Sequence, residues 1–132
     1  MKFLKRILGI CETQTPSTEN SWTYAAPTIT VRLSRLPEIQ KPGGAVRLEG
    51  AGLSGKILVV RGTDGAYHAF SNRCTHMGRR LDPLPGQDRL ECCSVSKSTF
   101  TYTGAPVSGA AKKPIKIFPT RVEGDELKIS LD

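Results

Sequence analysis

The chain has 132 residues, of which 38% are hydrophobic, and this is enough for one domain with its own core. Its formal net charge of +7 favours an acidic protein or an anionic membrane face as a partner. Nucleic acid is disfavoured, because the few aromatic residues do not interleave with the scattered basic ones as a stacking platform would. Four cysteines are too few for a disulfide scaffold, and no apolar run is long enough for a transmembrane helix.

Residues 1–10 place apolar side chains on one face of a short helix and basic side chains elsewhere. They lack the long apolar stretch and small-residue cleavage site of a secretory signal, so we expect the protein in the cytoplasm or at the cytoplasmic face of a membrane. Two interpretations stay open: a frayed terminus, and an amphipathic helix that contacts a partner or a membrane surface. We interpret Cys11, the next residue, as an incidental thiol rather than a lipidation site or ligand.

Residues 12–27 are rich in Thr, Ser, Asn and Pro, which predicts a linker. Its two large apolar side chains, Trp22 and Tyr24, either attach the linker to the domain or mark a contact surface. The predicted organisation is therefore an N-terminal segment and linker over 1–27, followed by one domain over 28–132.

The pattern changes at Thr28 to short β segments with turns between them. Alternating or apolar runs predict strands over 28–33, 45–48, 56–61, 67–70, 88–92, 100–102, 114–118 and 127–131. Asp64-Gly65 is a strong hairpin signal between two of these runs. Short strands at such even spacing predict an all-β sandwich or barrel.

Two groups of metal-ligand residues lie between the predicted strands. Cys74 and His76 form a Cys-x-His pair on one tight loop, and sixteen residues then separate His76 from Cys93. Thiolate and imidazole are the ligand types that suit zinc or iron–sulfur clusters. His68 lies within a strand, so we interpret it as a surface or core histidine rather than a ligand.

This arrangement resembles the Rieske [2Fe–2S] family over about Thr28 to Leu131. The family pattern is Cys-x-His, about sixteen residues, and then Cys-x-x-His-Gly-x-x-Phe or Tyr. Cys74-Thr-His-Met-Gly78 matches the first loop, and Phe100 sets the register of the second, with Cys93 as its ligand cysteine. The resemblance implies an antiparallel β-sandwich with a two-loop cluster-binding subdomain over about 73–101. It also implies a [2Fe–2S] cluster on two cysteines and two histidines.

The second loop departs from the family pattern, since Ser96 stands where the second histidine ligand belongs. Ser94 replaces the family proline, and Lys97 replaces the glycine. Three readings of Ser96 stay open: it ligates iron as an alkoxide, water or another residue completes the iron site, or the cluster is absent. Cys92 beside the ligand cysteine is either a core residue, which we favour, or a substitute ligand.

The resemblance gives further residues a role. Ser98 matches the position whose hydroxyl donates a hydrogen bond to a cluster sulfur. Arg79 and Val95 occupy the positions of the loop-bridging disulfide in quinol-oxidising members, so this chain is more similar to the ferredoxin-type branch. Arg73, Arg79, Arg80 and Lys97 surround the expected cluster, either as a solvated rim or as a docking surface for an acidic partner.

The sequence therefore predicts an electron-transfer component rather than a stand-alone enzyme. It would pass single electrons to or from a redox protein or larger complex. A cluster-free Rieske-fold subunit with a structural or interaction role is the alternative. A third reading is a zinc site on Cys74, His76, Cys93 and Cys92.

Overall fold

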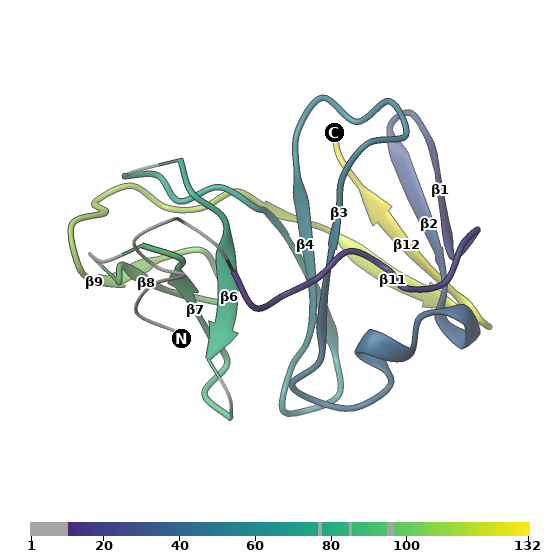
Figure 1. Ribbon diagram of the computed structural model, residues 1–132, viewed down its shortest axis with the longest axis horizontal. Coiled ribbons are helices and arrows are strands. Elements are labelled where there is room, and N and C mark those ends of the chain that lie inside the picture. Colours follow the sequence, from purple (N-terminus) through teal and green to yellow (C-terminus); the bar gives the residue numbers. More distant parts are fainter. Residues whose placement is uncertain (1–10, 77, 85, 95–96) are drawn as a thin grey trace.

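The computed structural model describes residues 11–76, 78–84, 86–94 and 97–132 (Figure 1). Within these residues the regular structure is twelve β-strands in three antiparallel sheets and two 3₁₀ helices, η1 (Leu33–Arg35) and η2 (Pro37–Ile39). The first sheet has the order β1 (Trp22–Ala25), β2 (Thr28–Arg32), β12 (Glu126–Ser130) and β11 (Thr120–Glu123). The second has the order β10 (Ile117–Phe118), β5 (Tyr67–Ser71), β4 (Ile57–Arg61) and β3 (Ala45–Leu48). The third has the order β6 (Leu81–Leu84), β7 (Arg89–Cys92), β8 (Thr99–Thr101) and β9 (Pro106–Ser108).

The first two sheets enclose the larger of two hydrophobic cores. Alternate residues of each strand point inward, so Ile29 and Val31 of β2 meet Leu127 and Ile129 of β12 in register. These side chains pack with residues of β3, β4 and β5 in one buried cluster. Trp22 and Tyr24 pack partly buried against the same cluster, as expected if they attach the N-terminal region to the domain.

The second core lies between the second and third sheets and supports the two loops. Leu58 and Val60 of β4 belong to it, whereas Ile57 and Val59 of the same strand belong to the first core. A strand buried on both faces explains why β4 is a continuous apolar run rather than an alternating one. Leu90 and Phe100, paired across β7 and β8, contribute the third sheet's side of this core.

The predicted all-β architecture is confirmed, and most predicted strands appear within one or two residues of their expected bounds. Strands β1, β6, β9 and β11 are not among the predicted runs, and β1 lies within the segment expected to be a linker. The amphipathic helix predicted over 1–10 lies outside the described residues. No helix among the residues that the structure describes is long and apolar enough to cross a membrane.

Candidate functional site

The first candidate ligand loop follows β5 and closes on itself through its own backbone. The Cys74 amide donates to the Arg79 carbonyl at 2.7 Å, and the Gly78 amide donates to the Cys74 carbonyl at 2.8 Å. Gly78 has φ +73°, a left-handed conformation that favours glycine, which explains the glycine at this point of the Cys-Thr-His-Met-Gly motif. The turn buries Cys74 and leaves His76 exposed to solvent.

The second candidate ligand loop joins β7 to β8. The Cys92 amide donates to the Ser98 carbonyl at 2.7 Å, and the Lys97 amide donates to the Ser94 carbonyl at 3.3 Å. Lys97 has φ +53°, so it adopts a conformation that glycine adopts more readily. The loop thus keeps a backbone suited to the glycine of the expected pattern although the residue has changed. Ser96 lies outside the described residues.

The two loops lie side by side, held by contacts between their flanking segments. The Cys93 amide donates to the Arg80 carbonyl at 3.0 Å. The buried Asn72 side chain uses its Oδ1 atom to accept the Leu81 amide at 2.8 Å. This bond ties the entrance of the first loop to the start of β6. The backbone therefore places Cys74 and Cys93 on adjacent segments; that the side chains of Cys74, His76, Cys93 and Ser96 converge on one cluster stays a prediction.

The thiols of Cys74 and Cys92 lie together beneath the loops, and neither belongs to the disulfide described below. The exposed fraction is 1% for Cys74 and 0% for Cys92, and both belong to the second core. Burial raises the pKa of the Cys92 thiol to about 12; the Ser94 hydroxyl, whose Oγ lies 3.2 Å from Cys92 Sγ, lowers it, and Cys74 raises it. The interpretation of Cys92 as a core residue agrees with this placement.

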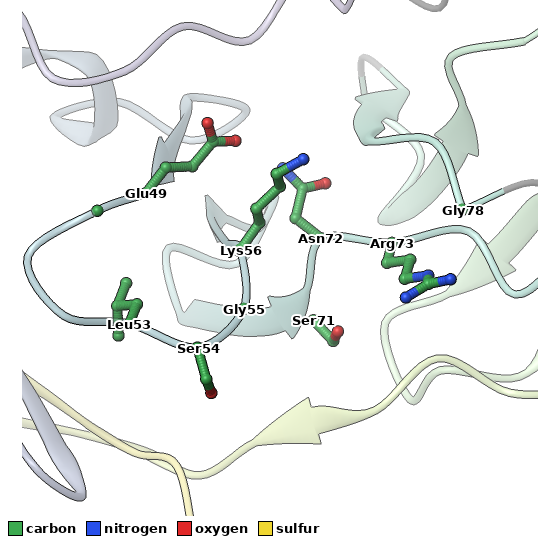
Figure 2. A pocket seen from close by; sticks show the side chains of 10 residues that line it. Glu49, Leu53, Ser54, Gly55, Lys56, Ser71, Asn72, Arg73 and Gly78 are labelled. Carbon is green, nitrogen blue, oxygen red and sulfur yellow. The ribbon is translucent and has the colours of Figure 1, made fainter.

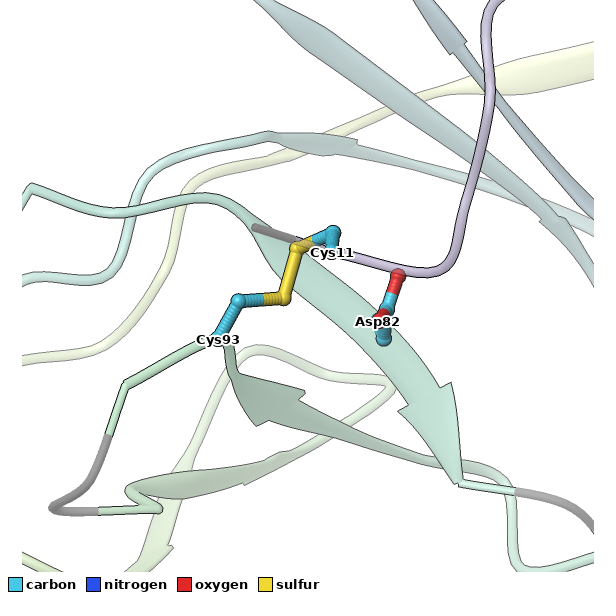
Figure 3. Close-up of side chains that lie close together, drawn as sticks. All are labelled: Cys11, Asp82 and Cys93. Carbon is cyan, nitrogen blue, oxygen red and sulfur yellow. A yellow bond between two sulfur atoms is a disulfide. The ribbon is translucent and has the colours of Figure 1, made fainter. Parts of the chain in front are cut away.

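Cys93 faces the opposite side of the third sheet and forms a disulfide with Cys11 (Figure 3). Two expectations therefore need correction: Cys11 is not an incidental thiol, and Cys93 is not a free thiol beside Cys74. The physical reason is strand alternation. Since Cys92 points into the second core beside Cys74, Cys93 points outward, where the N-terminal segment crosses β6. Neither this disulfide nor the position of Asp82 beside it was predicted from the sequence. A separation of 82 residues leaves no local signal of such a bond.

Ser98 is fully buried, and its Oγ accepts the Ala111 amide at 3.1 Å. A Cβ on Gly109 would meet Ser98 Cα at 2.5 Å, so the 109–111 segment packs tightly on the second loop. This contact fixes the serine beneath the loop. Its expected hydrogen bond to a cluster sulfur stays a prediction.

The residues around the two loops fit the usual ligand set of two cysteines and two histidines only in part. Cys74 and His76 are both on the first loop, and Cys93 would supply a second thiolate once its disulfide is reduced. The chain has only two histidines. The second, His68, packs against Tyr102 with ring centroids 4.7 Å apart, in the β4–β5 hairpin, as expected for a structural histidine. The fourth ligand would therefore be Ser96 or a non-histidine group.

A pocket of about 470 Å³ adjoins the first loop (Figure 2). Lys56 and Asn72 extend into this region from adjacent backbone segments, joined by a hydrogen bond from the Asn72 amide to the Lys56 carbonyl at 2.8 Å. Asn72 is 1% exposed, and its Nδ2 donor has no hydrogen-bond partner within the described part of the chain. Arg73 adds a second cation to the lining, and Glu49, the acid among the described lining residues, is bonded to Arg80 at 2.7 and 3.1 Å. Donors and positive charge therefore predominate.

Comparisons with known proteins agree on one family. The profile of the Rieske [2Fe-2S] domain matches residues 33–119. The cytochrome b6-f complex iron-sulfur subunit of Chlorobaculum thiosulfatiphilum is 34% identical over 76 residues, which are 57% of this chain and 40% of that protein. The ferredoxin component of the naphthalene 1,2-dioxygenase system of Pseudomonas aeruginosa is 29% identical over 84 residues, covering 62% of this chain and 80% of that protein. Among solved structures, the ferredoxin of carbazole 1,9a-dioxygenase from Nocardioides aromaticivorans is 27% identical with a TM-score of 0.62, over 78% of this chain and 98% of that one.

Proposed function

Because the chain belongs to the Rieske [2Fe-2S] domain family, we propose that it transfers single electrons to or from a protein partner. The observation that carries this proposal is the pair of ligand loops held side by side, with Cys74 and His76 on one and Cys93 on the other. These three residues would hold a [2Fe–2S] cluster, with Ser96 or another non-histidine group as the fourth ligand. When bound, such a cluster supplies a one-electron redox centre.

The side chains around the loops would bind and orient the partner. His76 is exposed, so the first ligand loop reaches the surface at which a second protein would dock. The adjacent pocket presents Lys56 and Arg73, two cations that suit a carboxylate side chain of an acidic partner. The similar ferredoxin components also bear names that assign them to multi-protein oxygenase systems, which is consistent with a separate partner here.

We also propose that residues 1–10 contact the partner or the cytoplasmic face of a membrane. The support is the sequence alone: apolar residues share one helical face, and an anionic lipid surface attracts a chain of net charge +7. Deletion of these residues should reduce vesicle or partner association without changing the folding of the β domain. Loss of folding in the deleted chain would contradict this proposal.

Visible absorption, with iron and sulfide analysis, tests the proposed cofactor in protein reconstituted under a thiol reductant. We expect about two irons and two sulfides per chain, since this is the composition of the family's cluster. Cys74→Ser and His76→Asn should lower the iron content, whereas the matched control His68→Gln should leave it unchanged. Zinc without sulfide would select a mononuclear metal site instead.

A cluster-free interaction subunit is the second candidate function. The observation that favours it is the incomplete ligand set, with two histidines in the chain and one of them packed against Tyr102. In that case, reduced and reconstituted protein would bind no iron but would still bind its partner. The Ser96→His variant separates the two candidates further, because it restores the usual ligand type and should increase iron retention only if the loops can close around a cluster.

A further inference from the structure

We infer that the Cys11–Cys93 disulfide is a redox latch. It holds the N-terminal strap (residues 11–17) on the domain and prevents the Cys93 sulfur from acting as a metal ligand. The inference rests on the proposed function for the ligand role of Cys93, but not for the latch itself. In the oxidised state the two sulfur atoms are bonded to each other. A sulfur in a disulfide is not a thiolate, and the thiolate is the metal ligand.

The strap is attached at several points besides the disulfide. The Asp82 carboxylate of β6 accepts the Glu12 amide at 2.7 Å and the Thr13 amide at 2.9 Å. Further along, the Gln14 carbonyl accepts the Arg47 amide of β3 at 3.0 Å. The Ser17 amide donates to the Glu38 carboxylate at 2.8 Å. The strap therefore crosses from the third sheet, beside the second ligand loop, to β3 and η2, as Figure 1 shows.

Among these attachments, the disulfide is the strongest link between the strap and the second ligand loop. The hydrogen bonds to Asp82 and Glu38 involve exposed or partly exposed groups, so each contributes modestly against competition from water. The disulfide joins residues that are 82 positions apart in the sequence. Because it is covalent, it opposes release of the strap more strongly than these hydrogen bonds do. Breaking it would leave residues 12–17 held by noncovalent contacts, which include the hydrogen bonds described above.

The other two cysteines are poor candidates for opening the latch from within. Cys74 and Cys92 face the opposite side of the third sheet, in the second core. Both thiols are buried there, so neither is placed to attack the Cys11–Cys93 bond. An external dithiol is therefore the reductant: it attacks one sulfur, forms a mixed disulfide, and leaves as a cyclic disulfide. Two electrons and two protons pass to Cys11 and Cys93, which become free thiols.

The environment of Cys93 connects this reaction to the second ligand loop. Its amide is bonded to Arg80 and its neighbour Ser94 contacts Cys92, so Cys93 stands at the point where β7 becomes the loop. Because Cys93 faces away from Cys74 across the third sheet, its sulfur reaches the first loop only if Cys93 reorients, and the bond to Cys11 prevents this until it is reduced. Oxidised and reduced chains would therefore differ in whether the family's second cysteine ligand is available.

The test uses the full chain in three forms: oxidised wild type, wild type reduced by a dithiol, and Cys11→Ser, which frees Cys93 without altering either ligand loop. Alkylation under denaturing conditions followed by mass spectrometry should count two free thiols in the oxidised form and four after reduction. Hydrogen exchange should be slow over residues 12–17 in the oxidised form, and at least about tenfold faster in the reduced and Cys11→Ser forms.

Iron loading under anaerobic conditions measures the consequence for the ligand site. We expect the reduced and Cys11→Ser forms to load roughly ten times more iron than the oxidised form. Loss of an outer-shell partner alone weakens a metal site about 10–100-fold, and loss of a direct ligand weakens it at least as much. Cys92→Ser is the control, and should load normally after reduction. If Cys92→Ser abolishes loading while Cys93→Ser does not, Cys92 is the ligand and the latch does not control it, which overturns the inference.

Failure of the proposed function is distinguishable from failure of the latch. If no form binds iron, the proposed cofactor is wrong, and the latch is judged by exchange and alkylation alone. Faster exchange over 12–17 together with native-state alkylation of Cys93 after reduction would support it. Four free thiols in protein purified without reductant, or unchanged exchange on reduction, would overturn it.

Discussion

Burial controls the reactivity of Cys92, the thiol nearest to the expected ligand residues. Because its pKa is raised to about 12, we expect slow alkylation by iodoacetamide at pH 8. The Ser94 hydroxyl bonded to Cys92 Sγ lowers that pKa, so Ser94→Ala should raise it further and slow the reaction. Mass spectrometry of the alkylated peptide against pH measures both effects. Ser108→Ala, an exposed serine of β9, is the control, and faster alkylation in Ser94→Ala would contradict the assignment.

Lys97 occupies a backbone conformation that suits glycine. The left-handed region costs a side-chain-bearing residue about 1 kcal/mol, and glycine's greater freedom in the unfolded chain offsets part of any gain. We expect Lys97→Gly to increase the free energy of unfolding by roughly 0.5 kcal/mol. Urea denaturation of both proteins measures it. Lys97→Ala is the control, since alanine keeps the Cβ, and an equal gain in that variant would assign the effect to charge instead.

The position of the two ligand loops could be predicted from single residues, but the orientation of their cysteines could not. The Cys-x-His motif and Phe100 were enough to locate two adjacent loops, because their spacing matches the pattern of the Rieske family. The orientation of two neighbouring cysteines was not predictable from the motif. It depends on which face of β7 meets the second core, and this is decided by packing with Cys74 and Leu90. The partner of Cys93 lies 82 residues away, so only the tertiary fold could reveal it.

At the scale of elements, the pair of Arg80 and Glu49 joins the loop subdomain to the end of β3. The hydrogen bond to Arg80 holds the pKa of Glu49 below its usual range, against the opposing effect of burial. A carboxylate with a lowered pKa in the folded state contributes stability above its unfolded pKa, and loses it as pH falls through the folded value.

We therefore expect Glu49→Gln to reduce the free energy of unfolding by about 1 kcal/mol at pH 7, since the pair is partly exposed. The difference from wild type should shrink below about pH 4, where the wild-type carboxylate also becomes protonated. Denaturant titrations at several pH values measure this. Glu123→Gln, whose exposed partner is Arg121, is the control and should have little effect. A Glu49→Gln deficit that persists undiminished in acid would refute the ion-pair explanation.

Residues 12–27 were predicted to be a linker, but the structure packs them against the domain. Residues 12–27 have a polar, turn-rich composition, and composition alone predicts a linker. Yet β1 pairs with β2 through four residues, and Trp22 and Tyr24 lie against the larger core. The ordering of this region comes from long-range bonds to Asp82, Arg47 and Glu38, which local composition does not encode. The strands after Thr28 were predictable because each alternates clearly or forms a short apolar run.

At the scale of the whole molecule, the two cores share β4, so the loops rest on the same strand that anchors the larger sandwich. Salt bridges and hydrogen bonds such as Arg80 to Glu49 and Leu81 to Asn72 then fix the third sheet against the second. The rim of the loops and the pocket beside the first loop form a polar surface next to the ligand residues. Its excess of donors and cations predicts how an acidic partner would bind.

A glutamate-rich peptide is a direct probe of that surface. If Lys56 and Arg73 form a carboxylate site, Arg73→Gln should weaken peptide binding roughly threefold at low salt, as expected for one exposed ion pair. Lys56→Gln removes the second cation of the pocket lining, so it should weaken binding by a similar factor. Calorimetry at two salt concentrations measures both, and affinity should fall as salt rises. Lys41→Gln, which changes an exposed lysine that does not line the pocket, is the matched control for net charge. Equal weakening by Lys41→Gln and Arg73→Gln would mean that the peptide senses only the total charge of +7, and would remove the pocket from the docking surface.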